Sequence, residues 1–392
     1  MDMENDMTKD AGLELEQSSE DEEPQQDPEE EPEQNPDPNP NPQFVTLHLR
    51  KRYLHGLAPS KDFGKIPGWG PLEKADTTAF VPTDNSTLPV LHIPLDKLRG
   101  LSDTLNWVKH MGYLISGHKT GYLVCKSDDP DTVAVPIADD TPLPTASTEY
   151  VYEPPAQAQH ERCIFLLRIV DGRIKVGKVA TAAKHAETAF PGSVAAREGS
   201  LCKISGLSRL MDYYNTSSHL VPARLGAAAV QSVLVRLGAA TNPAGDLDWG
   251  TPYKQWHFDP RVGVLLHAEL NLFVDRFKMG FYRYSPTGNE SYEAHHLNWP
   301  IKAADQDVDQ LKGWTKLSMR WDTLVLAGLL QDPVSQNQVE RLNLHGLAVD
   351  FPTGNTNGRP NPTFEVLSWH YAQCVVRKWG TTEYKEFTNV KW

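Results

Sequence analysis

The sequence predicts an α+β fold, and it does so through the order of its apolar patterns. Strand-like alternation of apolar and polar residues comes first, from Phe44 to Leu49. A helical pattern dominates the middle of the chain, and its longest stretch runs from Asp259 to Gly280. Aromatic and β-branched residues fill 364–379 and 384–392, which favours strands. We therefore predict N-terminal β-hairpins, a helical middle and a C-terminal strand pair.

An acidic arm precedes these elements. Residues 1–43 contain 16 Asp and Glu, a single basic residue, Lys9, and no aromatic residue, so they carry a net charge of −15. The whole chain carries −13, which leaves +2 for the remainder. The arm ends in a run of alternating prolines from Asn35 to Pro42, and each proline fixes φ and removes a backbone donor. With little apolar surface to offset the entropy of ordering, we expect 1–43 to be disordered.

The rest of the chain divides into a loop-rich α+β part, 44–160, and a helix-rich part, 161–392, with one continuous domain over 44–392 as the alternative. The first part is expected to contain a proline-rich loop from Gly56 to Pro94. A short helix should then begin at Ser102 and end at Gly112. Strands 113–115 and 122–125 should form a hairpin around the glycines between them.

The second part should open with a hairpin over 163–176, because Asp171-Gly172 fits the type I′ turn between two β-rich runs. In the central helix, Asp259 is the expected N-cap, Pro260 the first residue and Gly280 the residue after the end. Its wide apolar face suggests burial on more than one side. Further helices are predicted at 180–189, 206–214, 222–238, 318–331 and 333–345.

Two partial motifs for nucleotide or metal chemistry fail. Gly172–Lys178 matches the start of a phosphate-binding loop, but Val179 stands where a magnesium-binding Ser or Thr is required. His267-Ala-Glu269 matches half of a zinc deaminase motif. The other half, Pro-Cys-x-x-Cys, does not follow it. We therefore predict no cofactor and no catalytic residue from these motifs.

A metal site at the adjacent histidines is not expected either. His295 and His296 lie near Glu290 and Glu293, but adjacent residues of an extended segment point apart. The four cysteines are far apart and include no CxxC, so they predict separate reduced thiols. The N-terminal segment has no apolar signal region, and the longest apolar stretch is interrupted by polar residues. We expect a soluble intracellular protein that does not cross a membrane.

Two groups of residues are candidates for binding. Arg50, Lys51 and Arg52 form a basic cluster just after the arm, which suits contact with RNA, another polyanion or the arm itself; the alternative is a solvated strand end. Most tryptophans lie late in the chain, and we predict a subunit interface among them, with a hydrophobic core as the alternative. The interface candidates are Trp314, Trp321, Trp369, Trp379 and Trp392.

In overall build the chain resembles coat proteins of small double-stranded RNA viruses of plants and fungi, the partitivirus type. The features that carry the resemblance are a Pro-rich arm ending at Pro42, the Asp259–Gly280 helix, and aromatic segments around Trp314–Trp321 and Trp369–Trp379. The resemblance implies dimers that assemble into a closed shell around RNA, with the arm facing inward, and hence a virion location. Because the arm is acidic it cannot neutralise phosphate, which leaves Arg50-Lys51-Arg52 as the RNA-facing group.

The sequence thus favours a self-assembling structural protein, not an enzyme. The first alternative is an intracellular binding or adaptor protein whose acidic tail regulates a basic or aromatic surface. The second is a hydrolase-type enzyme whose active site comes from distant residues without a motif.

Overall fold

The computed structural model describes residues 42–51, 86–118, 120–127, 134–154, 181–204, 215–223, 227, 230–231, 234, 239–244, 247–250, 253–283, 291–297, 347–352 and 354–387. This part of the chain contains helices and several small sheets, which confirms the α+β class. Several sequence predictions lie outside the described residues. They are the acidic arm up to residue 41, Arg52, the hairpin at 163–176, the helices at 206–214, 318–331 and 333–345, Trp314, Trp321 and Trp392.

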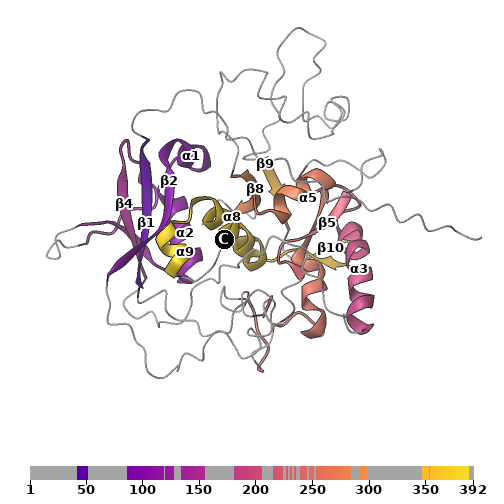
Figure 1. Cartoon of the computed structure of the whole chain (residues 1–392). Coiled ribbons are helices and arrows are strands. Elements are labelled where there is room, and N and C mark those ends of the chain that lie inside the picture. Colours follow the sequence, from indigo (N-terminus) through magenta and orange to yellow (C-terminus); the bar gives the residue numbers. More distant parts are fainter. Residues whose placement is uncertain are drawn as a thin grey trace, which may run out of the picture. The chain divides into compact units, whose positions relative to one another are not determined.

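The largest sheet has four strands in the order β2-β1-β4-β3. The strands are β1 (Phe44–Arg50), β2 (Thr87–Pro94), β3 (Tyr122–Cys125) and β4 (Thr148–Glu153). β1 is antiparallel to β2 and parallel to β4, and β3 is antiparallel to β4 (Figure 1). The predicted strand at 44–49 is confirmed. Because β1 is an inner strand, all its residues from Val45 to Leu49 are buried.

The loop predicted from Gly56 to Pro94 is wrong over its last eight residues, which form β2. Its prolines are compatible with a strand because β2 lies at the edge of this sheet. Pro89 also sits where the register with β1 shifts between Leu47 and His48. Pro89 and Pro94 therefore belong to an edge strand, and Pro89 lies at its change of register, whereas the sequence analysis interpreted them as loop residues.

Helices α1 (Leu95–Leu101) and α2 (Asn106–Ser116) follow β2. The predicted end of a helix at Gly112 and the strand at 113–115 are wrong, because α2 runs through both. Gly112 is a packing residue: a Cβ there would lie 2.5 Å from the ring of Tyr152. The helix ends instead at Gly117, which has φ 78°, the left-handed conformation that glycine adopts freely. β3 consequently pairs with β4 and forms no hairpin with 113–115.

The second group of elements begins with α3 (Thr181–Arg197), which confirms the helix predicted at 180–189 and extends it past Pro191. β5 (Asn215–His219) pairs with β6 (Gly263–His267). β7 (Met279–Arg283), β8 (Ser291–His296) and β9 (Leu347–Asp350) form an antiparallel three-stranded sheet. Shorter elements complete the group: η4 (Tyr253–Phe258), η5 (Pro260–Val262), α5 (Ala268–Asp275), β10 (Asn355–Thr356) and β11 (Arg359–Pro360).

The single helix predicted from Asp259 to Gly280 is wrong. Asp259 does cap a helix, and its carboxylate accepts a bond from the Arg261 N–H at 2.9 Å, but this helix is the short η5. The chain then extends at Gly263, where a Cβ would lie 2.4 Å from the Phe190 ring, and becomes the fully buried strand β6. Helix α5 and strand β7 follow. The broad apolar pattern thus reflects a buried strand beside a helix, which periodicity alone does not separate.

The predicted C-terminal strand pair is also wrong. Residues 364–379 form α8 (Phe364–Trp379), and α9 (Thr382–Phe387) covers the described beginning of the second segment. Every residue of α8 from Val366 to Val376 is buried, so aromatic and β-branched side chains pack on all its faces. Tertiary packing therefore overrides their strand propensity.

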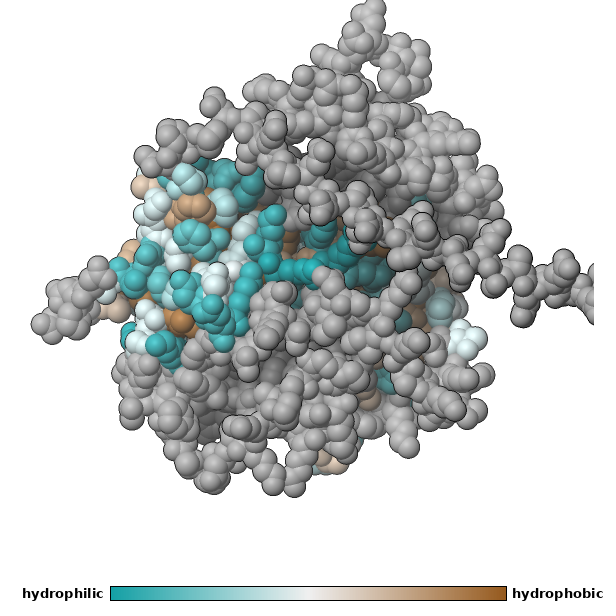
Figure 2. Space-filling model, in the orientation of Figure 1, coloured by the Kyte–Doolittle hydropathy of each residue, from teal (hydrophilic) through white to brown (hydrophobic). Residues whose placement is uncertain are grey.

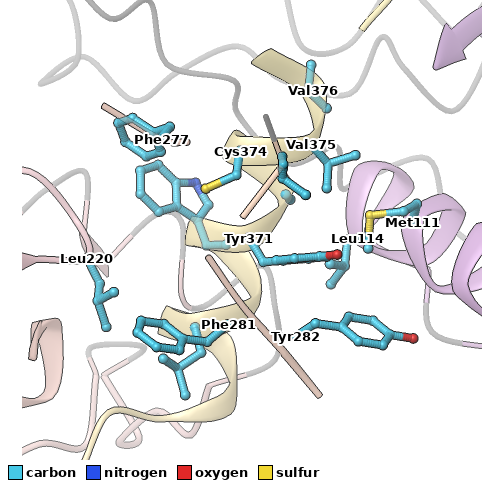
Figure 3. Close-up of a cluster of buried hydrophobic side chains, with 14 of the residues drawn as sticks. Met111, Leu114, Leu220, Phe277, Phe281, Tyr282, Tyr371, Cys374, Val375 and Val376 are labelled. Atoms are coloured by element: carbon cyan, nitrogen blue, oxygen red, sulfur yellow. The ribbon is translucent and has the colours of Figure 1, made fainter. Parts of the chain in front are cut away.

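The core is shared by both groups of elements. One hydrophobic cluster runs from Val45 in β1 to Tyr384 in α9. Helix α8 contacts α2, β2 and β7. Figure 3 shows the Tyr371 side chain extending from α8 towards Leu114 of α2, with Tyr282 of β7 next to it. α8 is thus the element around which the two groups pack.

Candidate functional site

The predicted basic cluster lies at the end of strand β1, where its first member already has a partner. The Nε of Arg50 donates to both carboxylate oxygens of Glu153, at 2.6 and 2.8 Å. Glu153 ends the neighbouring strand β4 and is almost fully buried. Lys51 follows, and its backbone N–H donates to the Ser86 carbonyl at 3.0 Å. A polyanion that binds Arg50 must therefore compete with Glu153.

The same face of the sheet carries further charge pairs. Glu149 of β4 accepts from Lys126 Nζ at 2.6 Å and lies 3.1 Å from His48 Nε2. The hydrogen bond from Lys126 lowers the pKa of Glu149, whereas burial lowers the pKa of His48. On the face shown in Figure 2, hydrophilic and hydrophobic residues of the described part are intermixed. This sheet face is therefore a mixed ionic surface and not a continuous basic patch.

The two described tryptophans of the predicted interface lie in the core of this chain. Trp369 is fully buried, and Trp379 packs edge-on against Trp107 with ring centroids 6.2 Å apart. Both belong to the hydrophobic cluster that includes α2 and α8. To contact another chain, these two side chains would first have to leave the hydrophobic core in which they are buried.

A buried hydrogen-bond chain links α2, α8 and β8, and we call it the Tyr371 chain. Trp107 Nε1 donates to the Tyr371 hydroxyl at 2.9 Å. The Tyr371 hydroxyl lies 2.6 Å from His295 Nδ1. His295 Nε2 lies 3.3 Å from Glu293 Oε2. Trp107, Tyr371 and His295 are at most 1% exposed, whereas the Glu293 side chain is 39% exposed. The Tyr371 chain thus leads from the core towards solvent.

The direction of each proton in the Tyr371 chain follows from its two ends. An indole N–H can only donate, so the Tyr371 oxygen accepts from Trp107. At the other end a carboxylate oxygen can only accept, so His295 Nε2 donates to Glu293, and Nδ1 of a neutral ring is left to accept the Tyr371 hydroxyl proton. A neutral imidazole with an accepting Nδ1 carries its proton on Nε2, and this N–H faces the Glu293 carboxylate. His295 is therefore the neutral Nε2–H tautomer.

Burial keeps the inner groups uncharged. It raises the pKa of Tyr371 well above its ordinary value, while the bond from Trp107 opposes this. It lowers the pKa of His295, while the hydrogen bond and charge of Glu293 oppose this. Tyr282 stacks on the His295 ring with centroids 5.1 Å apart, which adds apolar surface against the imidazole. The Tyr371 chain can pass or hold a proton between Glu293 and the core, but its inner members are fully occupied with one another.

The adjacent histidines point apart, as the sequence predicts, although they lie in strand β8. His295 faces Tyr371, whereas the His296 ring lies edge-on to Phe273 of α5 with centroids 4.8 Å apart. His267, at the start of α5, is buried, and its backbone N–H donates to Cys202 Sγ at 3.3 Å. Within the described ranges, no three His, Cys, Asp or Glu side chains are grouped to hold a metal ion.

Arg197, at the end of α3, is the second buried polar centre, and the sequence analysis missed it. Its Nε and Nη2 donate to Glu198 Oε1 at 2.9 and 2.6 Å. Nη1 donates to the carbonyls of Pro260 and Pro360 at 2.6 and 3.0 Å, and Nη2 also donates to the Gly263 carbonyl at 2.7 Å. All five N–H donors of the guanidinium are therefore satisfied. They join α3 to η5, β6 and β11.

The surroundings of Arg197 are satisfied as well. Lys203 Nζ lies 3.2 Å from the second carboxylate oxygen of Glu198, and both acid and guanidinium are buried. Asn357 donates to the Arg197 carbonyl at 3.0 Å. An Arg-Glu pair at the end of an alanine-rich helix is an ordinary surface pattern, so no sequence signal distinguishes this one.

Comparison with known proteins does not add a further candidate site. No protein-family model, curated protein or solved structure matches the chain. Among the helices of the described part, none has both the length and the apolar character needed to cross a bilayer. The candidates therefore rest on the ion pairs of the sheet face, the Tyr371 chain and the Arg197 centre.

The Arg197 centre predicts a strong effect on stability. Replacing Arg197 by Met removes its five hydrogen bonds to three backbone carbonyls and the Glu198 carboxylate, and should lower the free energy of unfolding by about 3–5 kcal/mol. Arg197→Lys should lose part of this, because one ammonium cannot reach all five positions. Equilibrium urea unfolding followed by circular dichroism measures the effect. Arg276→Met, at an exposed position, is the control and should change stability by less than about 0.5 kcal/mol. If Arg197→Met and Arg276→Met lowered the free energy of unfolding equally, the stabilising role given to Arg197 would be contradicted.

Proposed function

We propose that the protein is a self-assembling structural protein of the coat type, which forms dimers and then a closed shell around RNA. The observation that carries the proposal is the way the acidic arm joins the folded part. Phe44, the first residue after the arm, begins the inner strand of the four-stranded sheet. The residue to which the arm is attached is therefore held in place by the sheet.

The attachment point is held from several directions. The Gln43 carbonyl accepts the first N–H of α1, from Leu95, at 2.8 Å. The Phe44 N–H donates to Ser147 Oγ at 3.1 Å, and the Phe44 ring stacks on His92 with centroids 4.0 Å apart. A fixed point of attachment gives every copy of the chain the same folded start after its arm. That suits an assembly with repeated subunits, which is also what the resemblance to partitivirus-type coat proteins implies.

The proposed RNA contact is made by the body and not by the arm. The arm carries −15 and repels phosphate. The basic cluster of Arg50, Lys51 and Arg52 is the group that we propose for phosphate contact, and at Arg50 the phosphate would compete with Glu153. In this proposal the protein acts inside the cell and in the assembled particle, and its partners are other copies of itself and RNA.

Assembly is tested by the size of the purified chain. Multi-angle light scattering over a range of concentrations should detect a dimer and larger species, well above the 43.8 kDa of one chain. Negative-stain electron microscopy of the largest species should show closed particles. A chain that stays monomeric at the highest concentration contradicts the proposal and favours the adaptor protein with an acidic tail.

The arm is tested by deletion. Removing residues 1–42 should leave the circular dichroism spectrum of the body unchanged, and should strengthen RNA binding several-fold at low salt because a charge of about −15 is lost. Fluorescence anisotropy with a labelled RNA duplex measures the affinity. In the deleted protein, Lys51→Ala should reduce the slope of log affinity against log salt by about one.

A full-length variant with every arm Asp and Glu changed to Asn and Gln is the matched control. It should bind RNA like the deleted protein if charge, not bulk, is responsible. Unchanged RNA binding in both proteins at low salt would remove the proposed screening by the arm.

A further inference from the structure

The Tyr371 chain connects segments that are far apart in the sequence and otherwise meet through apolar contacts. Trp107 belongs to α2, Tyr371 to α8 and His295 to β8. Helix α8 packs against α2 and β7, and β7 pairs with β8. Hydrophobic packing alone tolerates small shifts between these elements. The hydrogen bonds of the Tyr371 chain depend on direction, so they restrict how α2, α8 and β8 are positioned against one another.

We propose that the Tyr371 chain is an acid-sensitive switch in which protonation of His295 at Nδ1 breaks the hydrogen bond from Tyr371 and loosens the junction of α2, α8 and β8. The step is a simple protonation: a proton from water adds to Nδ1, and no bond between heavier atoms changes. His295 then donates at both nitrogens. The Tyr371 oxygen can accept from Trp107 and His295 together. Its own hydrogen then loses the acceptor that the structure gives it.

The groups around His295 decide how strongly acid acts on it. Glu293, on the same strand, is the acid nearest to the imidazole and favours its charged form. Tyr282 of β7 covers the ring, and His110 of α2 lies edge-on to Tyr282 at 5.4 Å between centroids. Burial lowers the pKa of His110 to about 4, so His110 adds no positive charge above that pH.

Other buried titratable groups of the packed elements have a shifted pKa or face another partner. Tyr371 and Cys374 of α8 both have a raised pKa through burial, and burial with the charge of Glu365 raises the pKa of Tyr113 of α2 to about 12. Burial also lowers the pKa of His370 of α8, but its ring nitrogens face the carbonyls of Leu220 and Met279. His296, on β8, faces Phe273 on the other side of the strand. His295 is therefore the group of this junction whose titration acts directly on the Tyr371 chain.

The direction of the pH effect follows from the position of His295. In the unfolded chain a histidine titrates near 6.5, and burial lowers the pKa of His295 below this in the folded chain. The folded state therefore binds fewer protons than the unfolded state over this interval. Stability from His295 is fully present above pH 6.5 and is lost as the pH falls below 6.5. The switch acts within one chain and does not depend on assembly.

The test compares His295→Gln with the unchanged chain. Gln keeps an oxygen that can accept from Tyr371, but it does not titrate. The unfolding equilibrium constant is measured with urea between about pH 7.5 and pH 5. As the pH falls, the unfolding equilibrium constant of the unchanged chain should rise more steeply than that of the variant. The difference is at most about tenfold per pH unit, which is the effect of one proton. His92→Gln, at an exposed histidine, is the control and should follow the unchanged chain.

A second measurement does not depend on a variant that folds. Hydrogen exchange of the unchanged chain, read by mass spectrometry and corrected for the intrinsic effect of pH, compares segments at pH 7.5 and about pH 5. Peptides covering α2 and β8 should lose more protection than those around β3. Equal pH dependence of unfolding in His295→Gln and the unchanged chain, or equal loss of protection in all segments, overturns the proposal.

Discussion

The burial of helix α8 on every side is the constraint on which the rest of the described fold depends. Every residue from Val366 to Val376 is buried, so a polar side chain there is stabilised only by partners inside the protein. His370 and Tyr371 are adjacent and leave the helix in different directions. Each ring nitrogen of His370 lies 3.0 Å from a carbonyl oxygen, of Leu220 or Met279. Either tautomer thus has an acceptor, and α8 is tied to both β7 and the end of β5.

Tyr371 ties the same helix to the other side of the core. Its bonds to Trp107 and His295 require α2, α8 and β8 to meet at one position and one rotation of the helix. Hydrophobic packing supplies most of the stabilisation, but it tolerates small shifts more easily than a buried hydroxyl with two partners does. The Arg197 centre has the same role for α3, η5, β6 and β11. Buried charged and polar groups thus help to specify this fold.

The sequence predicted the fold where a segment is exposed on one side or has a clear local signal. β3 and the first part of α3 have such local signals, and the alternating pattern of β1 predicted a strand although both its faces are buried. The sequence failed where a buried strand and a helix follow one another directly and where a buried helix is rich in β-branched and aromatic residues. β6 is buried on both faces, and α5 follows it directly with further apolar residues, so their combined pattern resembled one long helix. In α8, Trp369, Val375 and Val376 have strand propensity, but packing around the helix outweighs it.

The candidate site was less accessible to prediction than the fold. The sequence drew attention to Glu293, His295 and His296 as a pattern of metal ligands, which is a different chemistry. The partner of His295 is Tyr371, 76 positions further along the chain, and Trp107 is 264 positions from Tyr371. Contacts over such separations arise only from the tertiary fold, and none of these residue types is unusual by itself. Arg197 and Glu198 likewise become distinctive only once their burial is known.

The proton order of the Tyr371 chain is the central claim, and nitrogen NMR of the histidine side chains tests it most directly. Protein labelled with ¹⁵N-histidine is measured near pH 7.5, and His295 is assigned by its absence in His295→Gln. The account predicts a neutral ring with the proton on Nε2 and an unprotonated, hydrogen-bonded Nδ1. A proton on Nδ1, or on both nitrogens, would contradict it, because His295 could then not accept the Tyr371 hydroxyl proton.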